Sequence, residues 1–206
     1  MKLKRFLIPI LPLAVLIGCT SLHNEQSGFL MDYANLKAAP GDRHQLADIA
    51  PDVMWSSYKS CIVDPVSTHF CKKCGEKISH DEQNYVADYF GKELNEVFAK
   101  DHAVATGPGA GTIRIRASVT DLDTSSTLVN LIAAALAWPV DYGGVTVEME
   151  AVDSVTGKRL AAIAGYFEGS PLDVVQSFFK FGHTREGINK YVRVLHKIAT
   201  PEKAKS

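Results

Sequence analysis

The most regular alternation of apolar and polar residues lies in the second half of the chain, and it predicts strands with one buried face. The segment TIRIRASVTDL, residues 112–122, alternates without a break, as expected for a half-buried strand. The segment VTVEMEAVDSVTGKRLAAIAGYFEG, residues 145–169, alternates on both sides of a turn near residues 153–157 and so predicts a hairpin. Shorter strands are expected at residues 60–66 and through Val104. The residues expected on the inner face are Ile113, Ile115, Ala117, Val119, Val145, Val147, Met149 and Ala151.

Two other stretches show the spacing of amphipathic helices. Ser79 and Glu82, three residues apart, have the spacing of a capping box, which marks the start of a helix. A C-terminal helical region is expected over residues 171–199, with breaks near Gly182 and Gly187. The apolar positions that recur at helical intervals after the capping box are Val86, Phe90, Leu94, Val97 and Phe98.

The order of these elements predicts an α+β domain. We expect a mostly antiparallel sheet with a long helix after the first strand and a C-terminal helix, with the helices on one face of the sheet. Residues 29–52 have no clear period and are interpreted as an irregular segment that lies over the domain. The glycine-rich residues 107–111 precede a strand rather than a helix, so a turn is expected there and not a phosphate-binding loop.

The N-terminus has a pattern of its own. A basic head is followed by an apolar run over residues 6–17 and then by Gly18 and Cys19, which is typical of a secretory signal peptide. The sequence LIGC at residues 16–19 resembles the bacterial lipobox. This resemblance implies cleavage between Gly18 and Cys19, and attachment of a diacylglycerol and an acyl chain to Cys19. Thr20 stands where an Asp would retain such a protein in the inner membrane, which points to the outer membrane.

These patterns divide the chain into four parts. Residues 1–18 are the predicted signal peptide, 19–28 a lipidated tether, 29–200 a single α+β domain and 201–206 a polar tail. The chain has 22 basic and 23 acidic residues, so its net charge gives no strong attraction to nucleic acid.

Three cysteines remain after Cys19, in a compartment that would be oxidising. A structural disulfide from Cys61 to Cys71 or Cys74 is the first interpretation. The spacing of Cys71 and Cys74, with His69 and His80 nearby, also fits a zinc site. A redox disulfide is the third alternative, and thiols without a role are the fourth. No other cofactor is expected.

Two further features carry functional hypotheses. Asp121 and Asp123 lie two residues apart at the end of a strand, so they can share a face and bind a cation or transfer protons. The ordinary interpretation is a strand end at the surface. The apolar residues 126–140 are interpreted either as a crossover packed on the sheet or as a surface for the membrane or a partner protein. That interaction surface would contain Leu128, Ile132, Leu136 and Trp138.

The order of five stretches along the chain gives a family resemblance. The stretches are SGFLMDY at 27–33, YKSCIVDPV at 58–66, VADYFGKELNEVFAKDHAV at 86–104, GAGTIRIRASVTDLD at 109–123 and VEMEAVDSVTGKRLAA at 147–162. With the lipobox before them, they resemble a family of uncharacterised bacterial lipoproteins, a domain of unknown function. The resemblance implies an envelope protein and brings no catalytic residues. The loop with Cys71 and Cys74 departs from the family pattern.

The leading hypothesis is an envelope lipoprotein, anchored in the outer membrane through Cys19 and facing the periplasm. Its domain is expected to be a binding or structural module rather than an enzyme, with envelope proteins or peptidoglycan as partners. The alternative is a small metal-binding or hydrolytic envelope protein. That protein would use the Cys71 and Cys74 loop or the Asp121 and Asp123 pair.

Overall fold

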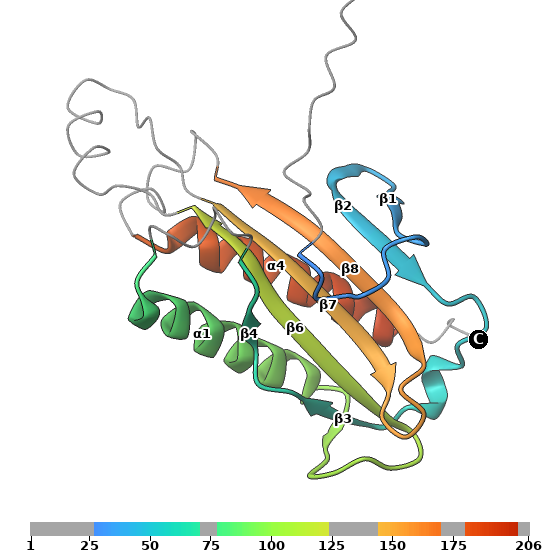
Figure 1. Cartoon of the computed structure of the whole chain (residues 1–206). Coiled ribbons are helices and arrows are strands. Elements are labelled where there is room, and N and C mark those ends of the chain that lie inside the picture. Colours follow the sequence, from blue (N-terminus) through green and yellow to red (C-terminus); the bar gives the residue numbers. More distant parts are fainter. Residues whose placement is uncertain (1–26, 71–77, 124–143, 170–179, 202–206) are drawn as a thin grey trace, which may run out of the picture.

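The computed structural model describes residues 27–70, 78–123, 144–169 and 180–201 of the 206-residue chain. In this part of the chain, two long helices lie on one face of an eight-stranded sheet (Figure 1). The helices are α1 (His80–Phe98) and α4 (Gly182–Ala199), and a single 3₁₀ turn, η1, spans Trp55–Ser57. The strands are β1 (Lys37–Ala39), β2 (Asp42–Ile49), β3 (Ser60–Val63), β4 (Ser67–Thr68), β5 (Ala103–Val104), β6 (Thr112–Asp123), β7 (Gly144–Asp153) and β8 (Arg159–Glu168).

The centre of the sheet is the antiparallel set β6, β7 and β8, as the alternating pattern predicted. The strand order is β1-β2-β8-β7-β6-β3-β5, and β4 also pairs with β6. Every residue predicted for the inner face is buried, with at most 2% exposure. The α+β prediction is confirmed, and the sheet is mixed because β3 and β4 run parallel to β6, as does β5 to β3.

The prediction of an irregular segment over residues 29–52 is wrong for its second half. β1 and β2 form an antiparallel hairpin, and β2 continues the sheet beside β8, with Gln45 opposite Gly165 and Ile49 opposite Ala161. Gly41 turns the hairpin at φ +80°. Backbone hydrogen bonds to β8 order β2, and these bonds leave no periodic signature in a segment with few apolar side chains.

The start of α1 carries the predicted capping box. The Ser79 hydroxyl accepts a hydrogen bond from the Glu82 amide at 3.4 Å, and the Glu82 carboxylate accepts one from the Ser79 amide at 2.8 Å. Lys180, just before α4, also pairs with Glu82. Lys180, followed by the bonds from Ser79, lowers the pKa of Glu82 to about 2. The two helices are therefore linked at the end where both begin.

The predicted helix break at Gly187 is wrong, because α4 continues through it. A Cβ at Gly187 would lie 2.6 Å from Val145 Cγ1 and 2.7 Å from Phe167 Cβ. The glycine therefore lets the helix pack closely on β7 and β8. Gly182 does mark the start of α4, and the preceding part of the predicted helical region, residues 170–179, lies outside the described residues.

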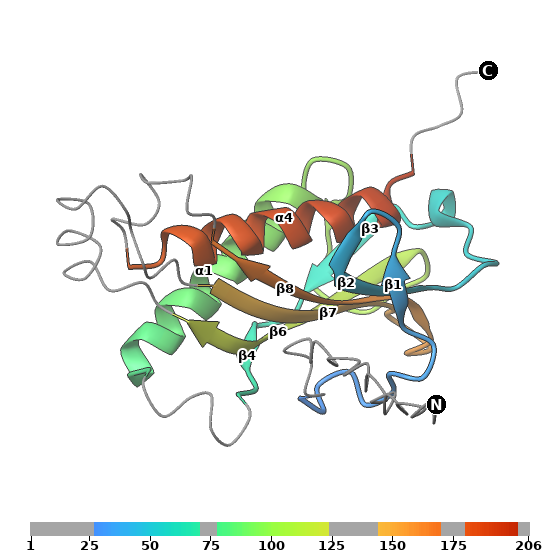
Figure 2. The ribbon, with the colours of Figure 1, turned by 90° about the horizontal axis from the view of Figure 1, so that it is seen from above.

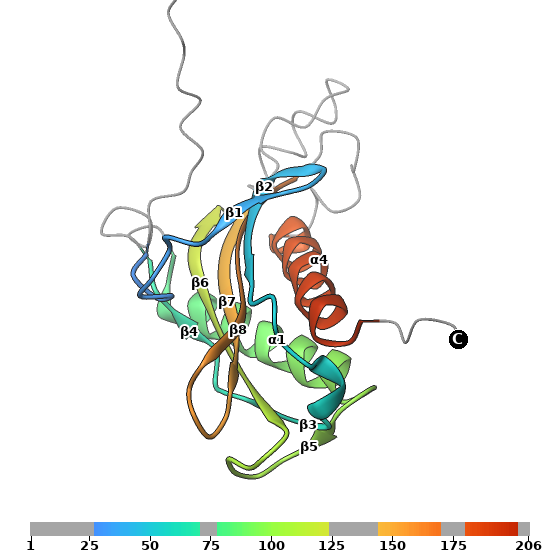
Figure 3. The same cartoon turned by 90° about the vertical axis from the view of Figure 1, so that its right-hand side faces the viewer.

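The face of the sheet opposite the helices carries the first described residues of the chain, 27–33, which we call the N-terminal strap (Figures 2 and 3). Leu30 is 1% exposed and packs with Ala162 and Ala164 of β8. These two alanines alternate with Ala161 and Ile163, which pack with the helices. The strap and the helix pair therefore cover opposite faces of the same strand.

Charged side chains fix the strap to the sheet. The Tyr33 hydroxyl donates to Glu148 Oε2 on β7 at 2.7 Å. Arg159 donates to the main-chain oxygens of Leu30 and Asp32. Its Nε also lies 3.0 Å from Glu150 Oε2. The strap is thus part of the folded domain.

Candidate ligand-binding site

The outer surface of α4 carries a row of polar and basic side chains. The inner surface of the helix is apolar and buried, through Ile188, Tyr191, Val192 and Leu195. Arg185, Asn189 and Arg193 recur every four residues, so they form one row along a different face. The amphipathic pattern that buries one side of the helix therefore places this polar row at the surface.

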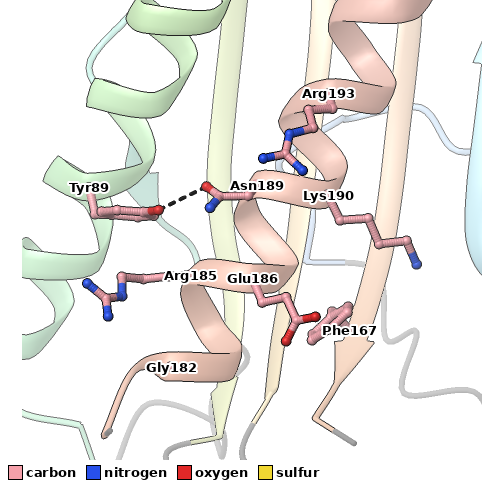
Figure 4. Close-up of a pocket in the computed structure, with 8 residues that line it drawn as sticks. All are labelled: Tyr89, Phe167, Gly182, Arg185, Glu186, Asn189, Lys190 and Arg193. Atoms are coloured by element: carbon pink, nitrogen blue, oxygen red, sulfur yellow. Dashed lines mark hydrogen bonds between the residues drawn. The ribbon is translucent and has the colours of Figure 1, made fainter. Parts of the chain in front are cut away.

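A surface cavity of about 540 Å³ lies along this row (Figure 4). Arg185 and Arg193 extend to the side of α4 on which Tyr89 of α1 lies, whereas Lys190 extends to the side of Phe167. Three of the lining side chains are basic and one is acidic. The full lining is Tyr89, Phe167, Gly182, Arg185, Glu186, Asn189, Lys190 and Arg193.

Tyr89 joins the two helices at the cavity. Its hydroxyl donates a hydrogen bond to Asn189 Oδ1 at 2.9 Å, which leaves the amide nitrogen of Asn189 as a donor. Burial raises the pKa of Tyr89, so the hydroxyl stays neutral and keeps this bond. The Arg185 guanidinium lies 5.9 Å from the centroid of the Tyr89 ring. The ring therefore supports Arg185 from one side without neutralising its charge.

The basic side chains of the cavity differ in their partners. Lys190 Nζ pairs with Asp42 Oδ2 on β2 at 2.6 Å. Burial would raise the pKa of Asp42, but hydrogen bonds from Lys190 and the His44 amide outweigh it and lower that pKa. Among the described residues, neither Arg185 nor Arg193 forms an ion pair with a carboxylate. In the described structure these two guanidiniums therefore differ from Lys190, whose charge is compensated by Asp42.

The polar residues at the start of α4 lie in regular helix and not in a loop. The helix break expected near Gly182 would place His183, Arg185 and Glu186 at the surface. His183 is instead 2% exposed, and its Nδ1 lies 3.4 Å from Glu186 Oε2. Because Glu186 faces this histidine and Phe167, it stands apart from the row that Arg185 and Arg193 share.

Most of the cysteine hypothesis lies outside the described residues. Cys61 is buried in β3 and has no disulfide partner among the described residues, and burial raises its pKa. Its candidate partners Cys71 and Cys74 are not among the described residues, so the disulfide stays a prediction. His69 and His80 are both exposed, before and at the start of α1. Within the described ranges, no group of three or more His, Cys, Asp or Glu side chains could hold a metal ion. A zinc site that includes Cys71 and Cys74 also stays a prediction.

The structure adds little about the remaining residues that were predicted as functional. Asp121 and Asp123 both belong to the end of β6, where the register shifts between Val119 and Asp121. Asp121 Oδ1 accepts a hydrogen bond from the Leu122 amide at 2.9 Å. The role of this acidic pair in cation binding or catalysis stays a prediction. The residues that fall outside the described part of the chain are Gly18, Cys19, Leu128, Ile132, Leu136 and Trp138.

Most residues of this cavity were not predicted from the sequence. The spacing of Arg185, Asn189 and Arg193 is a signal that a helical projection would have revealed. No comparable signal links Tyr89 to Asn189, because these residues are 100 positions apart and meet only when α1 packs beside α4. The contribution of Phe167 depends in the same way on the packing of α4 against β8.

Neither α1 nor α4, the long helices of the described structure, is both long and apolar enough to span a bilayer.

Several known proteins are similar to this chain. The uncharacterised lipoprotein YdcL of Escherichia coli K12 is 24% identical over 184 residues, which cover 86% of this chain and 79% of that protein. Among solved structures, a PelC dodecamer from Paraburkholderia phytofirmans is 16% identical, with a TM-score of 0.44 over 77% of this chain and 98% of that one. Protein XCC0632 from Xanthomonas campestris is 10% identical, with a TM-score of 0.41 over 72% of this chain and 87% of that one. A family model matches residues 25–195, and the chain therefore belongs to DUF3313, a family of proteins of unknown function.

Proposed function

We propose that this protein is a lipoprotein of the bacterial envelope that binds an acidic ligand in the cavity on α4. Acyl chains on Cys19 would anchor it in the outer membrane, with the folded domain in the periplasm. The lipobox sequence at residues 16–19 supports the anchor, as does the similarity to an E. coli lipoprotein. Thr20 supports the choice of membrane. The observation that carries the binding function is the pair of guanidiniums, Arg185 and Arg193, without carboxylate partners among the described residues.

The chemistry of the cavity favours an oxyanion. A guanidinium presents a fork of N–H donors that matches a carboxylate or phosphate group. The free amide nitrogen of Asn189 lies between the two arginines in the row and adds a neutral donor. Arg185 and Arg193 are eight residues apart, which corresponds to about 12 Å along a helix. An extended ligand with more than one acidic group would therefore use both arginines better than a single small anion.

The anchor predicts a defined change in mass and location. Intact protein extracted from the membrane fraction is expected to start at Cys19 and to carry the added mass of a diacylglycerol and an acyl chain. A Cys19→Ala variant is expected to lose this added mass and to leave the membrane fraction. An unacylated wild-type chain that retains residues 1–18 would contradict the anchor.

The cavity predicts a saturable site for polyphosphate. Titration of the detergent-solubilised mature protein with inorganic tripolyphosphate, an extended polyanion that can contact both arginines, followed by calorimetry, is expected to give one site. Arg185→Ala is expected to weaken binding at least tenfold, because it removes a charge-assisted hydrogen bond worth about 1.5–3 kcal/mol. Lys197→Ala is the matched control, since it removes a positive charge from an exposed position of the same helix outside the cavity. Equal affinities for wild type and Arg185→Ala would contradict the binding function.

A further inference from the structure

The chain between the proposed anchor and the strap is short. Eight residue steps separate Cys19 from Ser27, the first residue of the strap. A fully extended chain of this length reaches about 28 Å, and a flexible one averages about 16 Å. A folded domain of this size is about 40 Å across, from a radius of gyration of about 15 Å. The tether is therefore shorter than the domain that it holds.

We propose that the strap face of the sheet rests on the bilayer that holds the anchor, with the Met31 side chain in contact with lipid. This orientation rests on the lipid anchor proposed above. It places the helix layer, and the cavity on α4, on the side of the domain that faces away from that bilayer (Figure 3).

The short tether can restrain the orientation of the domain because the strap is rigidly attached to the sheet. The Tyr33 hydroxyl accepts hydrogen bonds from the amides of Gly28 and Leu30 at 2.9 and 3.3 Å, and itself donates to Glu148. The Ser27 amide donates to the other oxygen of Glu148 at 3.4 Å. Both ends of the strap are thus held on β7 through one buried carboxylate. A short tether that ends at Ser27 therefore restrains the whole domain and not a loose terminus.

Met31 is the apolar group that this geometry presents to the lipid. It is 87% exposed, the largest value among the exposed large hydrophobic residues of the described structure. Its φ of +60° is unusual for a residue other than glycine, and the neighbouring Leu30 is by contrast buried against the sheet. A flexible, unbranched side chain in this position suits the disordered boundary between headgroups and acyl chains.

The charges around Met31 do not require a lipid of particular charge. Asp64 Oδ1 pairs with Arg114 at 2.8 Å, and Glu150 Oε1 pairs with Arg116 at 2.6 Å. The hollow beside Met31 is also lined by Asp32, Asp48 and Lys158, so the strap face carries both signs in similar number. The contact should result from the anchor, the short tether and Met31, and it should depend little on salt because the two signs nearly balance.

Photo-crosslinking to lipid tests the orientation in the anchored, full mature chain. A benzophenone amino acid replaces Met31 in one variant, Lys158 on the strap face in a second, and Lys92 on α1 in a third. Lys158 lines the same surface hollow as Met31, and the Lys92 side chain is 69% exposed on the helix layer. Each acylated protein is placed in vesicles of phosphatidylethanolamine and phosphatidylglycerol, and lipid adducts are counted by mass spectrometry.

We expect at least ten times more lipid adducts at position 31 than at position 92, at both low and high salt. The variant at position 158 provides the same comparison if the bulky group at position 31 disturbs the strap. Equal adducts on both layers, or more at position 92, would overturn the orientation and leave the anchor intact. An unacylated chain in the membrane extract would overturn the anchor and the orientation together.

Discussion

Replacing Gly165 by alanine is expected to lower the free energy of unfolding by about 3 kcal/mol, at the upper end of what overpacking usually costs. A Cβ at this position would lie 2.4 Å from Cε1 and Cζ of the Tyr191 ring. The ring has no exposed surface, and its hydroxyl donates to the Tyr166 carbonyl at 2.7 Å. The ring therefore cannot move aside without losing a buried hydrogen bond. Thermal unfolding is expected to show a midpoint lower by about 6–12 °C.

Gly107→Ala is the matched control for this substitution. No atom lies within 4 Å of a Cβ at Gly107, and its φ is not in the left-handed region. Its stability is expected to stay within about 0.5 kcal/mol of wild type. In a Tyr191→Leu background, the cost of Gly165→Ala should fall, because the ring that opposes the new methyl group is gone. A Gly165→Ala protein as stable as wild type would show that the contact relaxes freely.

Glu150→Ala is expected to cost about 2 kcal/mol. The Glu150 side chain is 5% exposed and lies 2.6 Å from Arg116 Nη1 and 3.0 Å from Arg159 Nε. Removing one partner of a fully buried pair costs about 3–5 kcal/mol because it leaves a buried charge uncompensated. Here the side chains of Arg116 and Arg159 are 41% and 21% exposed. Both can turn partly toward water, which reduces the cost. Urea denaturation measures the change.

Glu96→Ala provides the comparison at the surface. Glu96 pairs with Lys92 at 3.7 Å, and both side chains are more than half exposed. Such pairs contribute about 0.5 kcal/mol or less, so the loss of Glu96 should be near the limit of detection. If the two substitutions had equal effects, the burial of Glu150 would have no energetic importance, and the network that fixes the strap would be weaker than its geometry indicates.

The parts of the fold that follow from sequence are those in which one face of an element is apolar. The alternation at residues 112–122 identified β6 and its inner face because a polar residue separates each apolar residue of that face from the next one. The capping box at Ser79 identified the start of α1 because its hydrogen bonds are local. By contrast, β2 carries few apolar residues and depends on backbone bonds to β8. Hydrophobic patterning records no such bonds.

The candidate site was less accessible to sequence reasoning for a related reason. Gly187 was interpreted as a helix breaker because glycine weakens isolated helices. In the fold it allows contact with Val145 and Phe167, and so brings Phe167 to the cavity. The meeting of Tyr89 and Asn189 depends on the packing of two distant helices. A sequence pattern predicts which face of a helix is polar, but it does not predict what lies opposite that face.

The short edge strands of the sheet have a consequence for the lipid-anchored protein proposed above. Anchored chains diffuse in two dimensions, so their effective local concentration is high. A long exposed strand edge would then act as a template for pairing between neighbouring molecules. In the described part of the sheet, the edge strands are β1, of three residues, and β4 and β5, of two each. Each offers few free backbone groups, and β1 begins with a lysine. Many copies could therefore crowd on one membrane surface without joining through their sheets.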